Sequence, residues 1–90
     1  MKVLNLLVKD NEYKKLDDLC KEIDSSFTLS KIKFQVQSGG LELIESSEEP
    51  DKSLKGFLYN NSNIVDYEKV DDVWVRSDCE GMIASVVISY

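Results

Sequence analysis

The chain of 90 residues contains no histidine, one proline, four glycines and two cysteines. The lack of histidine excludes Ser-His-Asp and Cys-His nucleophilic sites and the usual zinc ligand sets. Cys20 and Cys79 lie far apart in the sequence, so they match neither a Cys-x-x-Cys motif nor a disulfide framework. We therefore expect free thiols, no metal, no cofactor and a reducing, cytoplasmic location.

Long hydrophobic runs are missing as well. No apolar run approaches the roughly 18–20 residues that span a bilayer. The N-terminal run 3–8 stops at Lys9 and Asp10, and no small-residue cleavage site follows it, unlike in a signal peptide. The sequence therefore predicts no membrane partner.

Basic residues are scarce in the second half of the chain. The net charge is −6, but residues 1–40 carry seven basic and six acidic residues, whereas residues 41–90 carry four basic and eleven acidic residues. Proteins that bind duplex nucleic acid neutralise its phosphates with Lys and Arg, so this balance argues against direct nucleic-acid binding. It favours attraction to a basic protein surface, and the alternative is that the acidity serves only solubility.

The length predicts a single domain, residues 1–90, with one core. Between residues 13 and 23, apolar side chains recur at helical spacing, and Asp10 or Asn11 is the expected N-cap. The stripe consists of Tyr13, Leu16, Leu19, Cys20 and Ile23.

Most of the remaining chain is typical of strands. Residues 31–37 alternate apolar and polar side chains, and Ser38-Gly39-Gly40 followed by 41–45 predicts a β-hairpin. A strand is favoured for residues 3–8, although periodicity alone leaves a helical turn open. Further strands are expected at 56–59, 64–70, 73–76 and 82–90, the last one inside a sheet because it is rich in β-branched residues.

One early helix followed by antiparallel strands predicts an α+β fold. The helix would pack on a mainly antiparallel sheet of about five or six strands, as a two-layer sandwich.

Carboxylates gather around the single tryptophan between residues 66 and 80. Asp66 and Glu68 are two positions apart in a predicted strand, so they share one face about 6.6 Å apart. Such a row, with an aromatic anchor, could dock into a basic groove. The alternative is a solvated sheet face with the tryptophan in the core. The candidate partner-binding residues are Asp66, Glu68, Asp71, Asp72, Trp74, Asp78 and Glu80, and no catalytic residue is assigned.

In size, acidity and lack of histidine, the chain resembles the small inhibitors carried by phages and mobile elements, such as anti-CRISPR and anti-restriction proteins. This resemblance concerns composition and transfers no residue roles. It implies a non-catalytic protein that binds and blocks a basic macromolecular surface, with nucleic-acid mimicry as one means. One alternative is an immunity or antitoxin-like protein that neutralises a cognate toxin, and another is a small-ligand binder or enzyme that uses carboxylates. Homodimerisation would be a natural supplement to so small a core.

Overall fold

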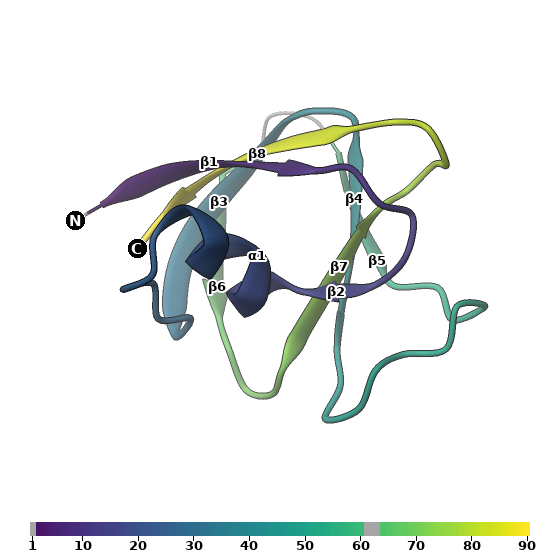
Figure 1. The fold of residues 1–90 in the computed structure, drawn as a ribbon, viewed down its shortest axis with the longest axis horizontal. Helices are drawn as coiled ribbons and strands as arrows, with labels where there is room; N and C mark the ends of the chain where they lie inside the picture. The colour runs from purple at the N-terminus through teal and green to yellow at the C-terminus, as the bar shows by residue number, and fades with distance from the viewer. Residues whose placement is uncertain (1, 61–63) are drawn as a thin grey trace.

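Two antiparallel sheets face each other and make up most of the molecule (Figure 1). The computed structural model describes residues 2–60 and 64–90. Sheet A has the strand order β1-β8-β3-β6, and sheet B has the order β2-β7-β4-β5. The elements are β1 (Val3–Val8), β2 (Lys14–Lys15), α1 (Leu16–Ile23), β3 (Lys31–Ser38), β4 (Gly40–Glu45), β5 (Phe57–Asn60), β6 (Val65–Glu68), β7 (Val73–Ser77) and β8 (Ala84–Ser89).

The core lies between the two sheets because their strands turn alternate residues inward. In β1, Leu4, Leu6 and Val8 are buried while the residues between them are exposed. Sheet B supplies Leu41 and Leu43 from β4 and its inward-facing residues from β7. The predicted strand at 3–8 is confirmed, and so is the interior position of the C-terminal strand, since β8 pairs with both β1 and β3.

The predicted fold of one helix on one sheet is wrong, because the layer opposite sheet A is a second sheet. The helix α1 is eight residues long and buries only Leu16 and Cys20 completely, which is too little to cover a four-stranded sheet. It contacts β1, β2 and β7, and so lies where the β1 edge of sheet A meets the β2 end of sheet B (Figure 1). No helix in the described ranges is long and apolar enough to cross a membrane.

The helix is also shorter than its predicted stripe. Tyr13 precedes β2 and lies outside α1, and Ile23 is half-exposed at 52%. Lys15 is the N-cap residue and makes no side-chain capping bond, so the predicted caps at Asp10 and Asn11 are wrong. Two residues intervene between Tyr13 and the helix because they form β2 and pair with β7.

The predicted hairpin at 31–45 is wrong for a geometric reason. Its two strands form, but β3 pairs within sheet A and β4 within sheet B. The chain changes sheets at Gly39, which has a φ of 74°. A Cβ at this position would lie 2.3 Å from the carbonyl oxygen of Ile83. Gly39 therefore marks a corner between two sheets, with the positive φ that a hairpin turn would also need.

Candidate interaction surface

A buried cluster of polar side chains lies on the outer face of sheet B. Tyr13, Glu42 and Arg76 are 4%, 6% and 4% exposed, and we call these residues the Arg76 cluster. Glu42 and Arg76 are directly opposite each other on β4 and β7. The Arg76 Nη2 donates to Glu42 Oε2 at 3.1 Å, and the guanidinium carbon lies 4.2 Å from the centre of the Tyr13 ring.

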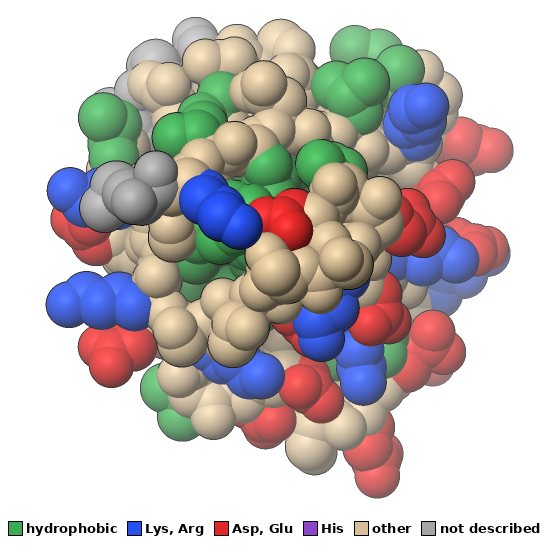
Figure 2. Space-filling view, turned by 60° about the vertical axis from the view of Figure 1, so that its left-hand side comes forward, with side chains coloured by type: hydrophobic (Ala, Val, Ile, Leu, Met, Phe, Trp, Pro, Cys, Tyr) green, Lys and Arg blue, Asp and Glu red, His purple; other side chains and the backbone are tan. Residues whose placement is uncertain are grey.

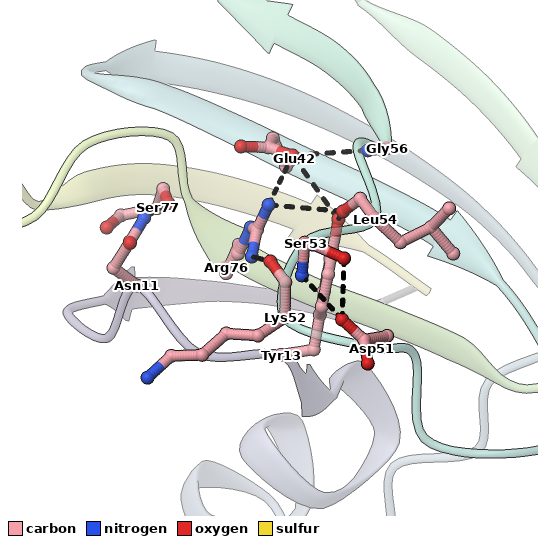
Figure 3. Close-up of polar contacts among 10 residues, drawn as sticks. All are labelled: Asn11, Tyr13, Glu42, Asp51, Lys52, Ser53, Leu54, Gly56, Arg76 and Ser77. Carbon is pink, nitrogen blue, oxygen red and sulfur yellow. Dashed lines mark hydrogen bonds and ion pairs between the residues drawn. The ribbon is translucent and has the colours of Figure 1, made fainter.

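The cluster is buried because the loop 46–56, which joins β4 to β5, folds across it (Figure 3). Arg76 donates to the carbonyl oxygen of Lys52 at 2.8 Å and to that of Leu54 at 3.2 Å. The Tyr13 hydroxyl donates to the same Leu54 oxygen at 2.7 Å. Glu42 accepts from the backbone N–H of Gly56 at 3.1 Å, so both signs of charge in the cluster hold the loop.

The loop is also fixed at its start and in its middle. The Trp74 indole N–H donates to the carbonyl oxygen of Ser46 at 3.0 Å. Asp51 accepts from the backbone N–H and the hydroxyl of Ser53 at 2.8 and 2.7 Å, which forms a local turn. These bonds to Ser53 hold the pKa of Asp51 below its ordinary value. The loop 46–56 is therefore an ordered cover.

The electrostatics of the cluster favour a charged Glu42. Burial raises the pKa of this carboxyl, but hydrogen bonds from Arg76, Gly56 and Tyr13 and the charge of Arg76 lower it more, so the net shift is downward. The pKa of Tyr13 is raised by burial. An ionised carboxylate that faces a buried guanidinium is the arrangement expected of a structural ion pair.

The outer face of sheet A differs because the charged side chains of β3 and β6 are exposed on it. The β3 residues Lys31 and Lys33 lie opposite Glu68 and Asp66 of β6, and all of these residues are exposed. The Lys33 and Asp66 side chains are 4.0 Å apart and are 60% and 74% exposed. Figure 2, which turns the side carrying both termini toward the viewer, also shows basic and acidic side chains interspersed.

Four of the predicted binding residues lie close together in the chain at this side of the molecule. Asp66 and Glu68 are on β6, and Asp71 and Asp72 are in the turn that leads to β7. We call these residues the β6 surface. Asp72 is half-buried and lies 3.7 Å from both Lys15 and Lys69. Basic residues therefore lie among the predicted row of carboxylates.

The other predicted residues lie elsewhere. Trp74 is 8% exposed and lies under the start of the loop 46–56, with the Lys15 ammonium 5.5 Å from its ring, so it cannot act as an exposed anchor. Asp78 and Glu80 are exposed beyond the far end of β7. A strand of five residues is about 16 Å long, so these carboxylates are distant from the β6 surface.

Sequence reasoning missed Glu45, which connects the two sheets beside the β6 surface. Its carboxylate accepts hydrogen bonds from the Tyr67 hydroxyl and, at 3.2 Å, from the backbone N–H of Val70. The bond from Tyr67 is the main reason that the pKa of Glu45 is lowered, and burial is the main reason that the pKa of Tyr67 is raised. It also missed the Arg76 cluster, for which the only signal was one Arg within the apolar run 73–76.

The inner side of β5 is open to solvent next to this connection. Phe57 lies opposite Leu43, which is 3% exposed, so Phe57 is on the inner face of sheet B, yet it is 75% exposed. Deeper in, Phe34 contacts Tyr59 and Tyr67 edge-to-face, with ring centres 5.2 and 6.2 Å apart. The side of the sandwich between β5 and β6 therefore has aromatic residues within it and an exposed apolar residue at its rim.

Within the described part of the chain, the core between the sheets is closely packed. The cavity enclosed by core residues of both sheets measures about 10 Å³. This is about the smallest volume that can hold one water molecule, so the cavity is too small for a ligand. A small molecule would have to bind at the surface. Searches for similar proteins give no match to a family model, a curated protein or a solved structure.

Proposed function

We propose that the protein is a non-catalytic interaction protein that binds and blocks a basic surface of a macromolecular partner through the β6 surface. The observation that carries this proposal is where the surplus acid lies. Of the eleven acidic residues in 41–90, Glu42 is buried and Asp72 is half-buried, and of the nine exposed ones Asp66, Glu68 and Asp71 belong to the β6 surface. Exposed charge of one sign attracts an oppositely charged partner and accelerates its association.

The contrast between Glu42 and the other acidic residues supports this proposal. Glu42 already has Arg76 and the loop N–H as partners inside the protein. Among the described residues, Asp66 pairs with a largely exposed lysine at 4.0 Å. An exposed ion pair of this kind contributes about 0–1 kcal/mol, so a partner's basic residue can replace it at little cost.

We also propose that this function is exerted in the cytoplasm. Both cysteines are free, Cys79 is exposed, and the compartments that keep exposed thiols reduced are intracellular. Burial and, less strongly, the charge of Asp17 raise the pKa of Cys20 to about 12, so this thiol stays protonated and serves as an apolar core group.

The test compares two variants with the same change in charge. One neutralises the β6 surface (Asp66→Asn, Glu68→Gln, Asp71→Asn and Asp72→Asn). The matched control neutralises exposed residues elsewhere (Asp18→Asn, Glu22→Gln, Glu48→Gln and Glu49→Gln). Each immobilised protein captures partners from a host lysate, and the salt concentration that elutes them is measured.

We expect the β6-surface variant to lose its captured basic protein at much lower salt than the wild type, while the control behaves nearly as the wild type. Urea midpoints of both variants should stay close to that of the wild type, because exposed charges and solvent-accessible ion pairs such as those of Asp72 contribute little to stability. If both variants released the partner at the same reduced salt concentration, the acidity would serve only solubility. Capture that does not depend on salt would contradict the proposal.

A further inference from the structure

The strand β6 is the outer strand of sheet A, and no strand of the described residues pairs with the far side of its backbone. The N–H of Lys69 donates to the carbonyl oxygen of Ser30 at 2.8 Å, so Ser30 and Lys69 form a hydrogen-bonded pair in the antiparallel ladder. Bonded and non-bonded pairs alternate along such a ladder. It follows that Tyr67 and Val65 bond to β3, whereas Asp66 and Glu68 turn their N–H and C=O groups toward the open edge.

The same two residues carry exposed carboxylates on the outer face, with the Asp66 side chain 74% exposed. On the inner face, Val65 and Tyr67 are half-buried and pack against the core. The edge therefore combines backbone groups that pair with no other described strand, acidic side chains on one face and apolar side chains on the other. The lysines of β3 lie one strand farther in, so an added strand would meet the carboxylates first.

We propose that the partner adds an extended segment to the open edge of β6, as a further antiparallel strand of sheet A, and that this segment alternates basic and apolar residues. This proposal rests on the proposed function and specifies the chemistry of its partner. In a bonded antiparallel pair, the two opposite side chains lie on the same face. The partner residues that bond to the backbone of Asp66 and Glu68 are therefore the basic ones, and those between them turn inward toward Val65 and Tyr67.

The charge of β6 also argues against a second copy of this chain as the occupant. Pairing of two β6 strands about a two-fold axis would place Asp66 and Glu68 of one copy opposite the same carboxylates of the other. Like charges directly opposite each other in a ladder are destabilising. A basic segment places opposite charges at those positions.

Synthetic peptides test this geometry. The probe is acetyl-Val-Lys-Val-Lys-Val-amide with a fluorescent label, and binding is followed by anisotropy at low salt. One derivative carries methyl groups on the backbone nitrogens of its two lysines, and the other carries one on the backbone nitrogen of its central valine. The two derivatives therefore have the same charge. We expect methylation on lysine to weaken binding about tenfold or more, because it removes the donors that face β6, and methylation on valine to leave binding nearly unchanged.

The protein variant Asp66→Asn/Glu68→Gln should weaken binding of the unmethylated peptide, while Asp18→Asn/Glu22→Gln should not. Equal binding of the two methylated peptides, or no binding of any peptide up to about 1 mM, which is the weak end of specific affinities, would overturn strand addition. The salt-dependent capture of a basic partner would survive that result, since it requires charge and not strand pairing. Sedimentation that shows a dimer of the wild type, strengthened by Asp66→Asn/Glu68→Gln because the facing carboxylates are removed, would assign the edge to a second copy and would also overturn the proposal.

Discussion

Glu42–Arg76 in sheet B and Lys33–Asp66 in sheet A are the same kind of pair in opposite surroundings. Each joins directly opposite residues on the outer face of an antiparallel sheet. The first pair is separated by 3.1 Å with side chains 8% and 5% exposed, and the second by 4.0 Å with side chains 60% and 74% exposed. The difference shows that what lies above an ion pair, and not its residue types, decides whether it holds the fold or is open to a partner.

The cover over the first pair is the loop 46–56. It joins β4 and β5, which are neighbours in the sheet and could be connected by a turn of about two residues. The additional length lets the loop return over the sheet, where carbonyl oxygens of Lys52 and Leu54 accept from Arg76. On sheet A the corresponding charged side chains, Lys33 and Asp66, are exposed to solvent.

The largest effect is expected when the buried pair is broken. Replacing Arg76 by Ala leaves Glu42 and the carbonyl oxygens of Lys52 and Leu54 without their main donor, which should cost about 3–5 kcal/mol of unfolding free energy. Urea denaturation followed by circular dichroism measures this change. A loss below about 1 kcal/mol, the range of exposed pairs, would mean that the loop does not hold the pair as described.

Lys33→Ala is the matched control for this change, because it breaks the corresponding pair of sheet A. We expect it to cost less than about 1 kcal/mol, the usual range of an exposed ion pair. A cost equal to that of Arg76→Ala would remove the distinction between the two faces.

A smaller effect is expected from acid. The pKa of Glu42 is lower in the folded protein than its ordinary value of about 4.3, so its contribution is complete above about pH 4.3 and is lost as the pH falls through the folded pKa. The wild type should therefore lose more stability between pH 6 and pH 3 than Glu42→Gln does. Lowered pKa values of Glu45 and Asp51 act in both proteins and cancel in the comparison. Equal losses would contradict the assignment of a charged Glu42.

The sequence predicted most strands, either from alternating apolar and polar side chains or from β-branched apolar runs. The alternation in 31–37 and the β-branched run at 82–90 are both typical of strands, and the structure places both segments in sheet A. The sheet change at Gly39 was not predictable, because a corner and a hairpin both require glycine with positive φ. Tyr13 was placed in the helix because its spacing fits, whereas its hydroxyl bonds Leu54, a contact that depends on the whole fold.

The candidate surface was partly predictable, because side chains alternate between the two faces of a strand. The parity of a strand puts Asp66 and Glu68 on one face, and both are exposed in the structure. Parity does not reveal which strand lies next to them, so the lysines of β3 were missed. The run Val73-Trp74-Val75-Arg76 is buried on both faces, because a loop that is distant in sequence covers its outer side.

Amide hydrogen exchange of the protein with and without the Val-Lys peptide tests the contrast between the two faces most directly. The account predicts that the peptide slows exchange at Asp66 and Glu68, whose N–H groups face the open edge, and leaves the loop 46–56 and the Arg76 cluster unchanged. Protection that appears in the loop 46–56 or in α1, with none at β6, would contradict it.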